Sequence, residues 1–107
     1  MTPHRDATEV DPDGHRVVFE NEHVRILEVR GATGTELAQH SHPPRVVVAI
    51  GPYRVKSVDT DGVETIIDRR PGDAAWVEQE HHAAQVLVGP THAIEVEVKS
   101  AAPDTTR

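Results

Sequence analysis

Residues 34–42 read Gly-Thr-Glu-Leu-Ala-Gln-His-Ser-His, and the pair His81-His82 follows about forty residues later. On a β-strand, residues two apart point to the same face because the side-chain period is two. His40 and His42 would therefore present two imidazoles side by side. A third imidazole from another strand would complete a facial metal site with three nitrogen ligands.

The composition limits the class of protein and the kind of ligand. A chain of 107 residues is expected to form one domain. Its 11 basic and 18 acidic residues give a formal net charge of −7, which argues against a nucleic-acid partner because such proteins usually carry a basic patch. There is no cysteine, so a metal ion would have to be held by nitrogen and oxygen.

The chain shows no membrane or export signal. No run approaches the ~18 apolar residues that a membrane span needs. The first twenty residues are polar and mixed in charge, unlike a signal peptide. We therefore expect a soluble, cytoplasmic protein with no membrane partner.

Short β-like runs separated by Gly, Pro and Asp turns fill most of the chain. The predicted strands are 17–20, 23–30, 35–42, 45–50, 53–59, 63–68, 73–77, 82–88 and 93–99. Many short strands at this spacing predict an all-β sandwich or barrel without substantial helix. The polar, aperiodic ends predict a flexible arm over 1–16 and a flexible tail over 100–107, on either side of a barrel domain at 17–99.

The chain resembles the cupins, in particular the short single-domain bacterial members. Their first motif is a Gly, five residues, His-x-His, three or four residues, a Glu and a distal Gly. Here it matches at Gly34, His40-Ser41-His42 and Gly51. Their second motif runs from Pro-Gly-Asp through a hydrophobic strand to a His, with an Asn three residues later. Here it matches at 71–73 and His82, with Gln85 in the Asn place.

The resemblance implies a cupin-type double-stranded β-helix, a jelly-roll barrel with a metal ion near its centre. The ligands that carry over are His40, His42 and His82, for a divalent transition metal such as Fe, Mn, Zn or Ni. His81 remains an alternative third ligand, since neighbours on a strand face opposite ways and a slip of one residue would exchange them.

One ligand position departs from the cupin pattern. The usual Glu falls at about Val46, which leaves three neutral ligands and a divalent ion with its full charge. Such a centre resembles the three-histidine sites of thiol dioxygenases and some diketone-cleaving cupins. We expect it to attract a small oxygen-rich molecule, in a pocket lined by Trp76, Val46, Val48 and Tyr53.

Other polar residues near the motifs have two interpretations each. Glu78 and Glu80 could move protons or form an exposed acidic loop. Arg45 could receive a substrate carboxylate or lie solvated at a strand end. Glu36 shares the parity of the motif histidines but begins its strand. His15 falls in the predicted arm, where adventitious nickel binding is its expected chemistry.

Three functions remain open. The first is a metal-dependent enzyme of dioxygenase or isomerase type. The second is a non-catalytic cupin that binds a small ligand. The third is an accessory protein with a degenerate site, its imidazoles hydrogen-bonded inside a metal-free barrel. A homodimer is expected in each case because an apolar sheet face and unpaired strand edges need cover.

Overall fold

A computed structural model describes residues 2–100, so residues 101–107 of the predicted tail lie outside the described part. Within it the chain forms one short helix, α1 (Ala7–Val10), and nine strands. The strands are β1 (His15–Glu20), β2 (Val24–Gly31), β3 (Glu36–His42), β4 (Arg45–Ala49), β5 (Tyr53–Asp59), β6 (Glu64–Arg69), β7 (Ala74–Val77), β8 (Glu80–Val88) and β9 (Thr91–Val98). Each predicted strand overlaps one of these, and the all-β prediction is confirmed. No helix among residues 2–100 is long and apolar enough to cross a membrane.

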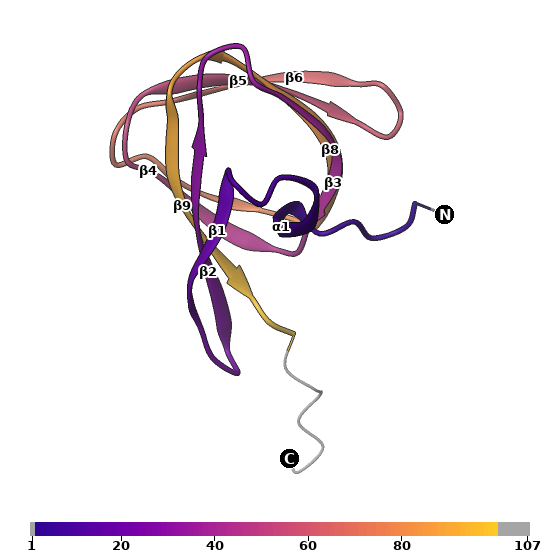
Figure 1. The fold of residues 1–107 in the computed structure, drawn as a ribbon, viewed down its shortest axis with the longest axis vertical. Helices are drawn as coiled ribbons and strands as arrows, with labels where there is room; N and C mark the ends of the chain where they lie inside the picture. Colours follow the sequence, from indigo (N-terminus) through magenta and orange to yellow (C-terminus); the bar gives the residue numbers. More distant parts are fainter. Residues whose placement is uncertain (1, 101–107) are drawn as a thin grey trace.

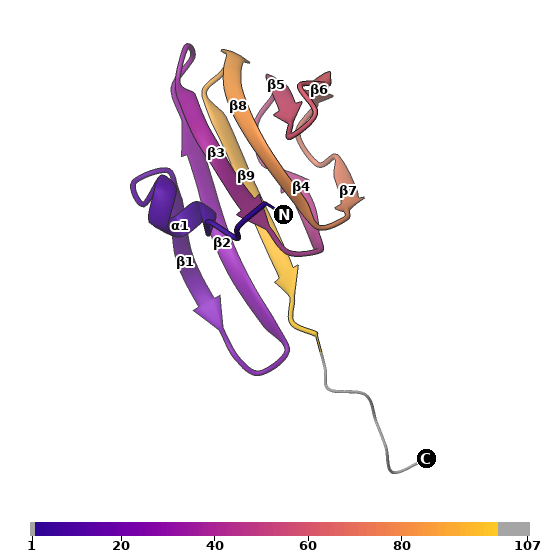
Figure 2. The same cartoon turned by 90° about the vertical axis from the view of Figure 1, so that its right-hand side faces the viewer.

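The strands form two antiparallel sheets that close around a common interior. The five-stranded sheet has the order β1-β2-β9-β4-β7, and the four-stranded sheet has the order β3-β8-β5-β6. Viewed as in Figure 1, the strands follow one another around a ring, with α1 between β1 and β3. Figure 2 shows the same strands from the side, with β1, β2 and β9 running past the rest of the barrel.

A small apolar core lies between the sheets. Its buried members are Leu27, Val29, Val47, Ala49, Tyr53 and Ala93. On β4 the inward positions are therefore odd-numbered, because successive side chains alternate between the two faces of a strand. The aliphatic composition of this core agrees with a chain that has single copies of Phe, Tyr and Trp.

The interior of the five-stranded sheet is also acidic. Along β9 the buried side chains include Glu95 and Glu97, whereas Ile94 and Val96 on the other face are half-buried. Glu97 accepts a hydrogen bond from Arg25 Nε at 2.5 Å, and Glu95 accepts one from Arg45 Nε at 2.9 Å. Buried carboxylates are tolerated only when paired in this way, so the arginines of β2 and β4 allow the acidic face of β9 to point inward.

The N-terminal segment differs from the predicted flexible arm. Asp6 caps α1 by accepting a bond from the Thr8 backbone N–H, and its carboxylate also accepts two bonds from Arg25. Ala7 is 1% exposed. The backbone of Ser41 on β3 donates to Arg5 O. These long-range contacts, which leave no periodic signal in the sequence, place residues 5–10 against the barrel and start β1 at His15.

Candidate metal centre

Strands β3 and β8 place three histidines in one buried cluster. In the register of the two strands His40 lies opposite His82, and His42 follows two residues later on the same face. All three are buried and line the interior cavity. The ring centroids are 4.7 Å apart for His40 and His42, 4.6 Å for His40 and His82, and 5.1 Å for His42 and His82. Of the neighbours His81 and His82, His81 faces away from the cavity. Its Nδ1 lies 2.6 Å from Ser41 Oγ.

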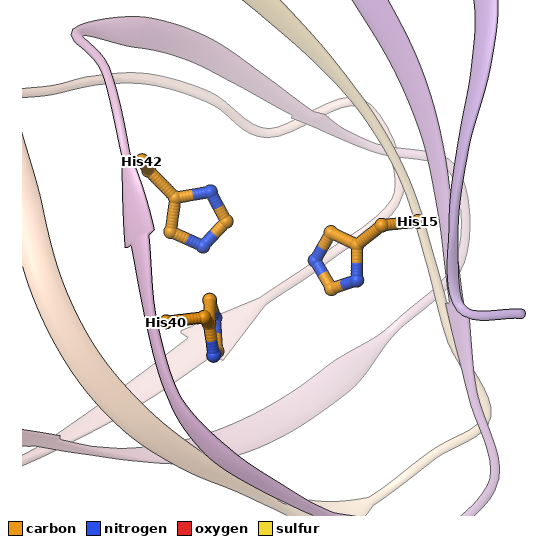
Figure 3. Close-up of side chains that lie close together, drawn as sticks. All are labelled: His15, His40 and His42. Atoms are coloured by element: carbon orange, nitrogen blue, oxygen red, sulfur yellow. The ribbon is translucent and has the colours of Figure 1, made fainter. Parts of the chain in front are cut away.

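A fourth histidine joins the cluster from the opposite sheet. His15 on β1 is buried, and its ring centroid is 5.7 Å from those of both His40 and His42. One ring nitrogen from each of these three residues lies within 4.8 Å of the other two (Figure 3). His15 thus begins a barrel strand and is buried, in contrast to the loose arm expected from the sequence, whereas adventitious nickel binding by its imidazole stays a prediction. No motif spacing pointed to it, since its partners are 25 or more positions away.

Hydrogen bonds to the barrel wall orient three of the four rings. His40 Nδ1 lies 2.7 Å from Ala38 O, and since a carbonyl can only accept, Nδ1 carries the proton. His15 Nδ1 lies 3.0 Å from the Asp11 carboxylate, which likewise accepts. His82 Nδ1 lies 2.7 Å from Ser57 Oγ. With Nδ1 occupied, Nε2 is the nitrogen left for a ligand, as in metal-binding histidines oriented from behind.

His42 is the exception. Its Nδ1 is buried and has no hydrogen-bond partner among the described residues, and the nearest carboxylate oxygen, Glu95 Oε1, is 3.5 Å away. An orphaned buried nitrogen is unusual in a folded protein and requires a reason. A cluster of imidazoles that receives a metal ion provides one, because the ion takes up a lone pair that the protein leaves unmatched.

Burial keeps the cluster neutral. It lowers the pKa of His40 and of His42, the latter far below the usual range with a further contribution from the Arg45 guanidinium. Burial also lowers the pKa of His82 to about 4, although the Glu80 carboxylate acts in the opposite direction. Neutral imidazole is the form that binds metal. These rings are therefore in the binding form at pH 7.

Ligand atoms in two overlapping groups are close enough to share an ion. One nitrogen each of His15, His40 and His42 lies within 4.8 Å of the others, and the same holds for one nitrogen each of His42 and His82 with a carboxylate oxygen of Glu80. With a metal–nitrogen bond of about 2.1 Å, two imidazole centroids on one ion are separated by about 4.5 Å at a right angle and about 5.2 Å at a tetrahedral angle. The separations among His40, His42 and His82, from 4.6 to 5.1 Å, lie in this range. The centroid of His15 is 5.7 Å from those of His40 and His42, beyond the tetrahedral value. The nitrogen-rich donor set suits Zn, Fe, Ni or Cu better than Mg or Ca.

The sequence predicted three neutral ligands and no carboxylate beside them. The structure differs, because two carboxylates border the histidines. On β4 the inward residue beside the expected Glu position is Val47, and Val46 faces outward. Glu80 and Glu95 instead line the cavity from β8 and β9. Both are bonded to Arg45, Glu80 Oε1 at 2.7 Å from Nη2 and Glu95 Oε1 at 2.9 Å from Nε. Arg45 is buried and does not lie solvated at a strand end.

Strand parity also corrects the predicted pocket. Tyr53 lines the cavity, but Val46, Val48 and Trp76 do not. Val46 pairs with Trp76 on the outer face of the five-stranded sheet, where Trp76 is 53% exposed. The cavity is about 130 Å³, and its apolar lining includes Val29, Leu37, Val47, Tyr53, Val55 and Val86.

The remaining polar candidates lie away from the cavity. Glu78 is exposed and accepts a hydrogen bond from Trp76 Nε1. Glu36 is exposed at the start of β3. Gln85 has the parity of His81 and faces away from the cluster. Of the proposed proton-transfer residues, only Glu80 borders the histidines.

The lowered histidine pKa values predict how stability depends on pH. A group whose pKa is lower in the folded chain is protonated first in the unfolded chain, so acid favours unfolding. For chelator-treated protein, the free energy of unfolding should hold above pH 6.5 and fall as the pH drops from 6.5 toward 4. His82, whose pKa moves from 6.5 to about 4, should account for about 3 kcal/mol of that loss.

Urea unfolding at several pH values measures this slope. His82→Gln should remove up to one proton from the pH dependence, whereas His23→Gln, which alters a side chain 76% exposed, should leave it unchanged. The slope is the informative quantity because it does not depend on the absolute stability of each variant. Equal slopes for His82→Gln and the parent chain would contradict the prediction.

Comparisons with known proteins identify the fold of the chain. No protein-family model matches the sequence, and no curated protein matches it. A cupin domain from Bordetella pertussis Tohama I is similar in structure, with a TM-score of 0.72 and 20% identity over 94% of this chain and 100% of that one. A Klebsiella pneumoniae protein with a double-stranded β-helix domain has a TM-score of 0.61 and 22% identity, covering 77% and 72% of the two chains. KdgF from a Halomonas species has a TM-score of 0.56 and 18% identity, covering 83% of each chain. The chain therefore has the fold of a small single-domain cupin.

Proposed function

We propose that this protein binds a divalent transition metal ion through His40, His42 and His82 and exposes it to a small oxygen-rich ligand in the barrel cavity. The observation that carries the proposal is the clustering of these three buried imidazoles, of which His40 and His82 have Nδ1 hydrogen-bonded to the wall and His42 has an unpartnered buried Nδ1. One nitrogen each of His15, His40 and His42 also lies within 4.8 Å of the others, a convergence that packing alone does not require. When bound, the ion supplies Lewis acidity to the oxygen atoms of a ligand.

The residues around the cluster suit a short ligand with an anionic end. Arg45 Nη1 is buried without a hydrogen-bond partner among the described residues, so the N–H groups of this nitrogen are free for a ligand oxygen. Glu80 Oε1 lies 3.7 Å from His82 Nδ1. From this position the carboxylate could accept a proton from a ligand bound beside the histidines. The aliphatic walls would hold the apolar part of the ligand and exclude water. These features support a dioxygenase- or isomerase-like reaction.

Metal analysis tests the site directly. Tag-free protein loaded with Zn(II) and then desalted should retain about one ion per chain. His40→Ala and His42→Ala should each reduce retention to a small fraction, and His82→Ala should weaken it. His23→Ala, at an exposed position, serves as the control. Substoichiometric zinc that is the same in all five proteins would contradict the proposal.

A non-catalytic ligand-binding role is the second candidate. It is favoured by the double pairing of Arg45, which ties up both carboxylates that line the cavity near the histidines. These hydrogen bonds hold both carboxylates against the guanidinium of Arg45 in the wall of the cavity. In this case the protein would bind the same class of ligand without changing it.

Ligand titration and turnover separate the two candidates. We expect small carboxylates or β-diketones to change the visible spectrum of the Co(II)-loaded protein, because they would occupy open positions on the ion. Oxygen uptake or proton exchange in the bound ligand, lost in Glu80→Gln, would support the enzyme. Binding at the same affinity with neither reaction would support the binding role. An unchanged spectrum with every ligand would contradict both.

We further propose that the protein forms a homodimer through the outer face of the five-stranded sheet. One row of apolar side chains crosses all five strands of this face, from Phe19 through Ile26, Val96 and Val46 to Trp76. Phe19 and Trp76, at its ends, are 51% and 53% exposed. A second copy also carries a net charge of −7. The row itself contains no charged side chain, so two such chains can meet along it without like-charge contact, while the charges of the same face are paired at Glu28 with Arg16, Arg30 and His92. A two-fold axis would place the row against itself.

Sedimentation equilibrium tests this interface. The parent chain should be a dimer at micromolar concentration, and Phe19→Ser combined with Trp76→Ser should shift it to monomer with little loss of stability, since both side chains are half exposed. Ile66→Ser, on the other sheet and 54% exposed, is the matched control. A monomeric parent chain would contradict the proposal and leave this face to a different partner.

A further inference from the structure

The N-terminal segment is built to hold one histidine in the cluster. Asp6 is anchored by Arg25 Nη2, with distances of 2.9 and 3.1 Å to its two carboxylate oxygens. Ala7 is buried. These contacts hold α1 between β1 and β3, as Figure 1 shows. The chain then turns into β1, whose first residue is His15.

The turn before β1 is shaped around the bond between Asp11 and His15. The Asp11 carbonyl accepts from the His15 backbone N–H at 3.0 Å, and its carboxylate lies 3.0 Å from His15 Nδ1. A Cβ on Gly14 would lie 2.1 Å from Asp11 Oδ2 and 2.8 Å from the backbone oxygen of Arg30. Only glycine leaves room for the carboxylate to reach the ring. The residues at 11, 14 and 15 therefore act as one unit.

This unit turns His15 toward the two motif histidines. Asp11 engages Nδ1, so Nε2 is the ring nitrogen left for a ligand, and the ring faces His40 and His42 from the opposite sheet (Figure 3). The group formed by His15, His40 and His42 brings one nitrogen of each residue within 4.8 Å of the others. A carboxylate behind a ligating imidazole is a recurrent way to fix its tautomer and raise its basicity.

We infer that His15 is a metal ligand supplied by the first strand, with Asp11 as its positioning residue, so that the bound ion joins the two sheets. The inference rests on the proposed function, since it adds a ligand to the same centre. It also makes metal binding and docking of the N-terminal segment a single coupled process. An ion that binds more tightly when His15 is in place stabilises that arrangement, by an amount that grows with the logarithm of the free ion concentration above its dissociation constant.

Metal affinity tests the inference. Zn(II) dissociation constants are measured by competition with a chromophoric chelator for the parent chain, His15→Gln and Asp11→Asn. We expect a loss of about a hundredfold or more for His15→Gln and about tenfold for Asp11→Asn. The visible spectrum of the Co(II) form should change for His15→Gln because the number of nitrogen ligands falls. His4→Gln is the matched control, since His4 lies in the same segment with a side chain 54% exposed.

Hydrogen exchange gives a second measurement that needs no variant. In the parent chain Zn(II) should slow amide exchange across residues 7–16, and this protection decides the question if His15→Gln does not fold. Parent-like zinc affinity and an unchanged Co(II) spectrum in folded His15→Gln would overturn the inference. If His40→Ala abolishes binding in the same experiment, the proposed function stands without His15. If His40→Ala also binds normally, both fail.

Discussion

Four imidazoles can share one cavity in this barrel because the barrel wall supplies partners for the nitrogens that do not face the cavity. Ala38 O, the Asp11 carboxylate and Ser57 Oγ each meet one Nδ1 atom. Without those partners the buried rings would carry unsatisfied polar groups, which cost stability. The same bonds decide the chemistry, since they leave Nε2 for a ligand. Burial then lowers the pKa values of His40, His42 and His82 and keeps these three rings in the neutral form.

A second requirement is the neutralisation of charge around the cluster. Two arginines pair with the acidic interior face of β9, and each also contacts a carboxylate from another part of the chain. Arg45 reaches Glu80 on β8, and Arg25 reaches Asp6 ahead of α1. The arginine that pairs with Glu97 thus also anchors the segment that delivers His15. The N-terminal residues and the histidine cluster consequently depend on two neighbouring sets of ion pairs, each of which includes an inward-facing glutamate of β9.

The outcome for strand β4 shows where a sequence pattern is insufficient. Alternation correctly predicts that Val46 and Val48 share a face, and that Arg45 and Val47 share the other. It does not say which face is inside. An arginine would ordinarily be placed in solvent, yet here it is buried because Glu80 and Glu95 lie across from it. With Arg45 inside, the expected pocket residues Val46 and Val48, and Trp76 paired with Val46 on β7, lie on the outer face.

The sequence by itself determined the all-β class, the approximate limits of nine strands, and the placement of His40 and His42 on one strand face. These follow from turn residues and the two-residue period, which act over short distances along the chain. Only the tertiary structure decided that His82 faces inward, that Arg45 is buried, and that His15 completes the cluster. Those outcomes depend on strand register and on charge pairs between residues far apart in the chain, and no local pattern of residues encodes such contacts.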